Sequence, residues 1–118
     1  MKILIVDDEQ ANRLILQAML NKGGYDIVQA SNGVEAIETF EKEHPDLILM
    51  DVMMPVMDGI EACRRIRETE GLADLPVIML TAKAQASDIQ TGFSTGATDY
   101  VVKPFSPREL LSRVRGSL

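Results

Sequence analysis

The chain has 118 residues, a length typical of one domain with one hydrophobic core. Its 12 basic and 18 acidic residues give a net charge of −6, which disfavours nonspecific binding to nucleic acid or to an anionic membrane. The start, MKILIVDDE, is not typical of a signal peptide, and no apolar run approaches the roughly 20 residues of a membrane span. We therefore expect a cytoplasmic protein.

Short apolar and β-branched runs alternate with longer segments of helical spacing. The runs that predict strands are 2–6, 26–30, 46–50, 76–80 and 99–102. They are mostly apolar throughout rather than alternating, which is typical of strands buried on both faces.

Apolar residues recur at three- and four-residue spacing between these strands. Ala11, Leu14, Ile15, Ala18 and Met19 follow the pattern of one apolar helix face, which predicts the first helix. Four later segments carry similar stripes: Ala36, Ile37 and Phe40; Ile60, Cys63 and Ile66; Ala86, Ile89 and Phe93; and Leu110, Leu111 and Val114. The only cysteine, Cys63, cannot form an internal disulfide, and its place in a stripe favours a core role.

Three helices also begin with recognisable capping signals. Asn32 and Asp58 each stand three residues before a glutamate, as in a capping box. Ser106 precedes Pro107, which suits the first helical position. Five strands that each precede a helix predict an α/β fold: a doubly wound, flavodoxin-like parallel sheet of order 2-1-3-4-5, formed by residues 1–118 as one domain.

Polar residues follow four of the five predicted strands. Asp7 and Asp8 follow the first strand, Asp51 the third, Thr81 the fourth and Lys103 the fifth. Because the carboxyl ends of parallel strands share one edge, and strands 1 and 3 are neighbours in this order, the three carboxylates should converge.

Three carboxylates without histidine or cysteine favour a hard cation, Mg²⁺ in a cell, which also accepts phosphate oxygens as ligands. Asp51 stands alone on the central strand and is the natural nucleophile for an aspartyl phosphate. Lys103 and the hydroxyl of Thr81 can stabilise phosphoryl oxygens.

Each of these residues alone has a structural interpretation. Asp8 can cap the first helix, Thr81 can be structural, and Lys103 can be a solvated charge. The joint placement of acid, hydroxyl and lysine at the strand ends favours phosphoryl chemistry instead.

The motifs ILIVDDE, PDLILMDVMMPVMDG, PVIMLTA and GATDYVVKPF occur in the order seen in receiver domains of two-component response regulators, which the chain resembles over essentially its whole length. The resemblance implies that a histidine kinase or histidine phosphotransfer protein donates a phosphoryl group to Asp51, with Mg²⁺. It also implies that Asp8 ligates Mg²⁺ directly, Asp7 through water, and Met53 through its backbone carbonyl.

The resemblance further implies a switch pair, Thr81 and Tyr100, with Lys103 as counter-ion of the phosphoryl group and a cis Lys103–Pro104 bond. The surface expected to respond runs from about residue 84 to residue 114. Its partner would be a downstream protein or an output domain, and homodimer formation on activation is left open. Such a domain is a signalling receiver rather than a turnover enzyme, with no direct binding to nucleic acid or membrane.

Three alternatives are open. A flavin protein would need a Ser/Thr/Gly-rich phosphate loop after the first strand, where this chain has Asp7, Asp8 and Glu9. An aspartate-nucleophile phosphatase usually carries its nucleophile in a D-x-D motif at that place. A degenerate receiver that only docks partners would not need the complete acid, threonine and lysine set.

Overall fold

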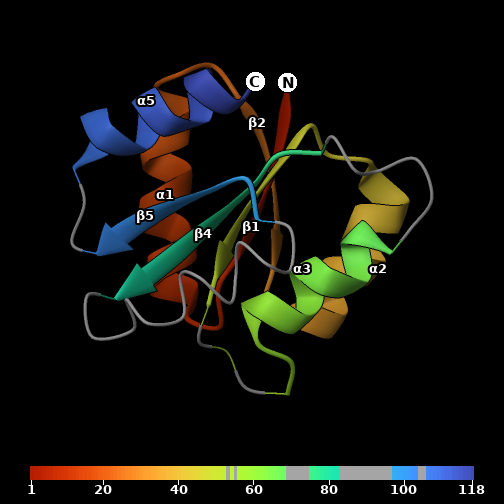
Figure 1. The fold of residues 1–118 in the computed structure, drawn as a ribbon. Coiled ribbons are helices and arrows are strands. Elements are labelled where there is room, and N and C mark those ends of the chain that lie inside the picture. Colours follow the sequence, from red (N-terminus) through yellow and green to blue (C-terminus); the bar gives the residue numbers. More distant parts are fainter. Residues whose placement is uncertain (53, 55, 69–74, 83–96, 104–105) are drawn as a thin grey trace.

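The computed structural model describes residues 1–52, 54, 56–68, 75–82, 97–103 and 106–118. Its elements, labelled as in Figure 1, are β1 (Lys2–Val6), α1 (Gln10–Asn21), β2 (Asp26–Ala30), α2 (Gly33–Glu43), β3 (Leu47–Asp51), α3 (Gly59–Arg67), β4 (Val77–Ala82), β5 (Asp99–Lys103) and α5 (Pro107–Ser117). The helix predicted around Ala86, Ile89 and Phe93 lies outside the described residues.

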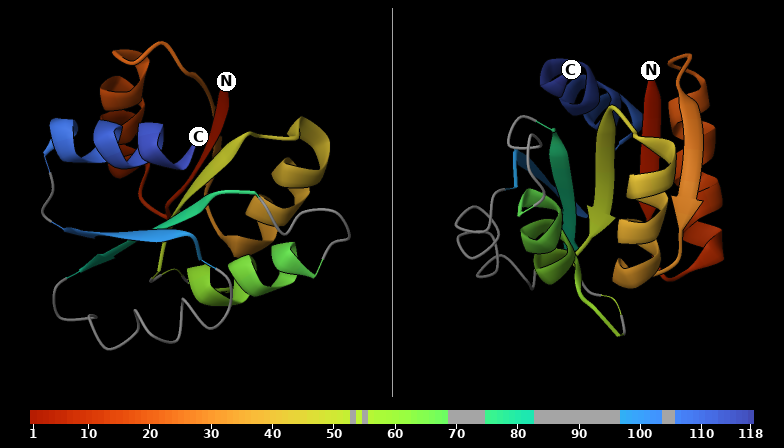
Figure 2. Two further views of the ribbon diagram at one scale, coloured as in Figure 1. Left: turned by 45° about the horizontal axis from the view of Figure 1, so that its top comes forward. Right: turned by 90° about the vertical axis from the view of Figure 1, so that its right-hand side faces the viewer.

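The five strands form one parallel sheet in the order β2-β1-β3-β4-β5, which confirms the predicted fold. Helices α1 and α5 cover one face of the sheet, and α2 and α3 cover the other (Figures 1 and 2). No helix among the residues that the structure places is long and apolar enough to cross a membrane.

The core has two halves because successive strand residues point to opposite faces of the sheet. Leu4 and Val6 of β1 belong to the cluster beneath α2 and α3, whereas Ile3 and Ile5 belong to the cluster beneath α1 and α5. Both faces of the central strands are therefore dry, as their continuous apolar sequence predicts.

Three strands reach further than their sequence predicts. β3 includes Asp51, β4 continues through Ala82, and β5 continues to Lys103. The register explains the extension, because Asp51 pairs with Leu80 and Ala82 with Lys103. The polar residues at the strand ends are thus held by the sheet itself.

The predicted helix starts are confirmed. The side chains of Asn32, Asp58 and Ser106 each accept a hydrogen bond from the backbone N–H three residues later. In α3, the carboxylate of Glu61 accepts hydrogen bonds from Arg64 and Arg65. These bonds, first that from Arg64 and then that from Arg65, lower the pKa of Glu61 to about 2.

The face of α1 that was predicted to pack against the core is the wrong one. Leu16 and Leu20 are buried, whereas Leu14 and Ile15 are 55% and 54% exposed. The α1 sequence has apolar residues in two phases of the helical repeat, and contact with β1, β2 and α5 decides which phase is covered. The predicted stripe of α1 is therefore largely a surface feature.

The core role predicted for Cys63 is confirmed, whereas the interpretation of Asp8 as the cap of the first helix is wrong. Cys63 is buried in the core beneath α2 and α3, and burial raises the pKa of its thiol. Glu9 is the N-cap residue of α1, which begins at Gln10, so Asp8 does not cap this helix.

Candidate functional site

The carboxyl ends of β1 and β3 bring three acids together. One ligand atom of each of Asp7, Asp8 and Asp51 lies within 4.8 Å of the others. Asp7 is 1% exposed and Asp51 7%, while Asp8 is exposed. The carboxylate of Asp7 is oriented by the backbone N–H of Glu9, which donates to its Oδ1 at 2.9 Å.

One described lysine, at the end of the edge strand β5, reaches this cluster. Lys103 Nζ lies 3.3 Å from Oδ2 of Asp51, although the residues are 52 positions apart in sequence. When the side-chain atoms alone are counted, Lys103 is 34% exposed and Asp51 is 9% exposed. The lysine charge is therefore directed at the acid of the central strand.

The electrostatics of the cluster favour a further cation. Two unit charges about 4 Å apart repel by about 4 kcal/mol at an effective dielectric constant of about 20. Three acids make three such pairs, and Lys103 contacts only Asp51 in the hydrogen bonds described for it. An all-oxygen ligand set of this size fits a hard divalent ion such as Mg²⁺.

Thr81 and Tyr100 lie on the same face of the sheet. Tyr100 pairs with Met79 in the register, and Thr81 follows Met79 by two residues, so all three point to one side. Thr81 is 0% exposed and Tyr100 is 8% exposed. Both side chains are therefore buried on the same face of the sheet.

Some predicted residues cannot be placed. The part of the chain that the structure describes does not include Met53, Pro104 or residues 84–96 of the expected output surface. On the described part of that surface, Arg108 is exposed, and Arg113 donates to Asp99 at 3.1 Å. The charge of Arg113 is thus partly compensated within the chain.

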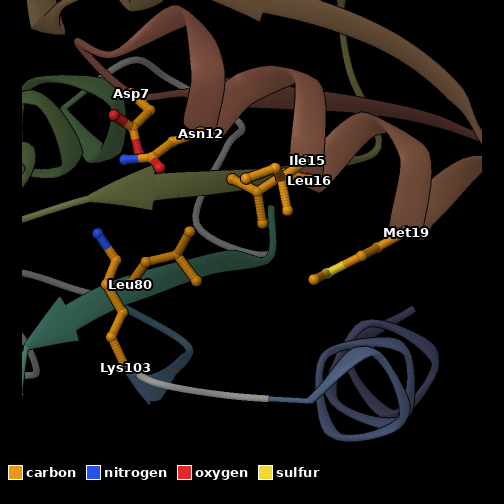
Figure 3. A pocket seen from close by; sticks show the side chains of 7 residues that line it. All are labelled: Asp7, Asn12, Ile15, Leu16, Met19, Leu80 and Lys103. Carbon is orange, nitrogen blue, oxygen red and sulfur yellow. The ribbon is translucent and has the colours of Figure 1, made fainter.

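The sequence missed a cleft beside the acids. It measures about 310 Å³ and lies between α1 and the ends of β4 and β5 (Figure 3). Asp7, Asn12, Ile15, Leu16, Met19, Leu80 and Lys103 line it. In Figure 3, the nitrogen of Lys103 points toward the end of the cleft where Asp7 lies. Ile15 and Met19, which are four residues apart and share one face of α1, form part of the apolar wall of the cleft.

The site disfavours a flavin phosphate loop. Such a loop offers backbone N–H groups and hydroxyls to a phosphate, whereas Asp7 here already occupies the N–H of Glu9. The acids at β1 would repel a phosphate in the absence of a cation.

Comparison with known proteins agrees with this geometry. A "Probable transcriptional regulator ycf27" of Porphyridium aerugineum is 48% identical over 117 residues, which are 99% of this chain and 48% of that protein. The chain thus spans about half the length of the curated relatives that it matches.

Two solved structures are similar along nearly the whole chain. A putative response regulator from Chloroflexus aurantiacus has a TM-score of 0.94 and 39% identity, with 98% of this chain and 95% of that chain covered. The receiver domain of sensor histidine kinase PA1611 from Pseudomonas aeruginosa, solved with a magnesium ion in its active site cleft, has a TM-score of 0.89 and 36% identity, with 98% and 94% covered.

The family model described as "Response regulator receiver domain" matches residues 3–115. The general function of this family in two-component signalling is phosphorylation on an aspartate. The fold, the strand-end acids and this match together show that the chain belongs to the response regulator receiver domain family.

Proposed function

We propose that residues 1–118 act as one receiver domain that takes a phosphoryl group from a phosphohistidine onto Asp51. The observation that carries this proposal is the meeting of Asp7, Asp8 and Asp51 at one edge of the sheet, with Lys103 3.3 Å from Asp51. The partner is a histidine kinase or a histidine phosphotransfer protein, and the place of action is the cytoplasm.

Asp51 is the nucleophile of the transfer. One carboxylate oxygen of Asp51 forms a bond to phosphorus while the bond from phosphorus to the donor imidazole nitrogen breaks, and that nitrogen keeps the electron pair. Because Asp51 is only 7% exposed, little water competes with it for the phosphoryl group. Lys103 lies where its ammonium group can contact a phosphoryl oxygen and offset the added negative charge.

The residues present fit Mg²⁺. Asp7, Asp8 and Asp51 would hold it, with the backbone carbonyl of Met53 as a further ligand. When bound, Mg²⁺ would supply positive charge beside the phosphoryl oxygens. The bond from Glu9 N–H keeps Asp7 oriented toward the cluster, and burial of Asp7 limits competition from water.

The donor protein docks on α1. Its phosphohistidine must reach Asp51, and Ile15 lines the same cleft as Asp7 and Lys103. Leu14 and Ile15 are more than half exposed on a helix that begins three residues after Asp7. An apolar helical surface of the donor would cover these two side chains while its histidine faces the cleft.

Phosphorylation changes the packing of Thr81 and Tyr100. A phosphoryl group on Asp51 adds close to two negative charges and strong acceptor oxygens, toward which the hydroxyl of Thr81 can move. Movement of Thr81 alters the space beside Tyr100 on the same sheet face, which biases a two-state element. The expected output surface, from about residue 84 to residue 114 and including β5, carries this change to a downstream protein or an output domain.

The switch is tested with beryllium fluoride and Mg²⁺, an inert mimic of the phosphoryl group. Amide NMR signals of β5 and α5 should shift as well as those of the site, while α2 should change least. The matched control is Thr81→Ala, which should keep the shifts at the site and lose those of α5. Shifts confined to the loops of Asp7, Asp51 and Lys103 in the wild type would refute the switch.

The central test of the function is labelling by acetyl phosphate with Mg²⁺. The wild type should gain one phosphoryl group, detected by intact mass and released by base. Asp51→Asn should gain none, because an amide is a poor nucleophile. Asp58→Asn is the matched control, since Asp58 is an exposed helix cap that asparagine replaces well. Equal labelling of the wild type and Asp51→Asn would refute the assignment.

A further inference from the structure

Arg13 of α1 makes a contact that the phosphoryl chemistry above does not use. Its Nη1 donates to the backbone carbonyl oxygen of Asp7 at 2.6 Å, and its Nε donates to Oε1 of Gln29 on β2 at 3.2 Å. Gln29 Nε2 in turn donates to Oε1 of Gln17, one helical turn after Arg13. The guanidinium group is therefore held between the end of β1, the edge strand β2 and α1.

The carbonyl that Arg13 holds belongs to the peptide between Asp7 and Asp8. A peptide unit is planar, so a fixed carbonyl oxygen also fixes the direction of the Asp8 N–H and Cα. The side chain of Asp7 is held separately by the N–H of Glu9. Arg13 thus acts on the one link between two acids of the cluster without occupying a carboxylate oxygen.

The position of Arg13 does not serve the stability of α1. Arg13 closes the first turn, where the helix dipole disfavours a positive charge. The first turn of α1 carries no acidic residue, and its N-cap Glu9 makes no side-chain capping bond. The contact with Asp7, rather than helix formation, therefore accounts for an arginine at this position.

We propose that Arg13, braced by Gln29 and Gln17, is a positioning residue that sets the Asp7–Asp8 peptide for Mg²⁺. The inference rests on the metal site of the proposed function. The proposal predicts the direction in which the affinity for Mg²⁺ changes when Arg13 is replaced. The charge of Arg13 by itself repels a cation, so removal of a merely nearby charge would tighten Mg²⁺ binding. Removal of a positioning residue weakens it, because the acids are no longer preset.

The test measures the Kd of Mg²⁺ by calorimetry and NMR titration in the absence of any phosphodonor. Arg13→Met should raise the Kd about tenfold, as is common for groups that orient metal ligands. Gln29→Leu, which keeps the charge and removes the brace, should raise it by a few fold. Arg115→Met removes the same charge from the last turn of α5, near the chain termini at the opposite end of the sheet (Figure 1), and should leave the Kd unchanged.

Thermal unfolding without Mg²⁺ tests whether each variant is folded. If Arg13→Met does not fold, the Kd of Gln29→Leu decides the question. A Kd that falls or stays the same in the folded variants overturns the positioning role while the proposed function stands. Absence of Mg²⁺ binding in the wild type overturns the metal site itself, and this inference with it.

Discussion

Replacing Gly59 with alanine would place a methyl group against the backbone of the residue that we propose as phosphoacceptor. A Cβ at Gly59 would lie 3.0 Å from the carbonyl carbon of Asp51 and 3.1 Å from Cα of Val52, and closer still to the carbonyl oxygen of Asp51. Ordinary contacts of a Cβ begin at 3.4 Å. Because the obstructing atoms belong to the backbone, they cannot rotate away.

The packing of α3 on β3 prevents easy relief of this clash. The backbone N–H of Gly59 donates to the carbonyl of Val52 at 2.9 Å, so α3 cannot retreat from β3 without straining this bond. Overpacking of this kind costs about 1–3 kcal/mol. At about 4 °C per kcal/mol for a chain of this size, Tm should fall by about 4–12 °C.

The same displacement should disturb the chemistry, since a shift on the order of 1 Å at a reacting group can cost on the order of 100-fold in rate. We expect Gly59→Ala to be labelled by acetyl phosphate at least about tenfold more slowly. Gly116→Ala is the control of opposite sign. A Cβ at Gly116 in α5 meets nothing within 4 Å, and alanine is the better helix former, so its Tm should stay equal or rise. A wild-type Tm and labelling rate in Gly59→Ala would refute this reasoning.

Three further predictions follow from the site and its surroundings. Mg²⁺ at ten times its Kd should stabilise the wild type by about 1.4 kcal/mol through mass action, and Asp8→Ala should lose most of this gain in thermal unfolding; an unchanged response would refute Asp8 as a ligand. The double variant Leu14→Ala, Ile15→Ala should lose on the order of 1–2 kcal/mol of donor binding and so about tenfold in phosphotransfer from a phosphohistidine protein, with unchanged labelling by acetyl phosphate; equal loss in both assays would argue against docking on α1. Because the pKa of Glu61 is lowered from 4.5 to about 2, its contribution to stability is complete above pH 4.5 and is lost as the pH falls through 2. Glu61→Gln should therefore lower Tm above pH 4.5 and converge with the wild type near pH 2, and a constant difference in Tm across this range would contradict the sign.

The local elements could be predicted from the sequence. Alternation of apolar runs with helical stripes predicted the parallel sheet, because continuous apolar strands are typical of burial on both faces, and the common doubly wound topology supplied the order. The caps at Asn32, Asp58 and Ser106 were equally predictable, since a cap depends on residues three positions apart. The convergence of the strand-end acids followed from the predicted topology, since the carboxyl ends of parallel strands lie at one edge of the sheet.

The contacts between distant segments depended on the tertiary structure. The sequence could not choose the buried face of α1, because two phases of apolar residues were available and the neighbours of α1 decided between them. The reach of Lys103 to Asp51 and the clamp of Arg13 on Asp7 join elements whose register and packing no local pattern encodes. Residue types and spacing specified which groups meet at the sheet edge, and packing of helices onto the sheet decided how each group is held there.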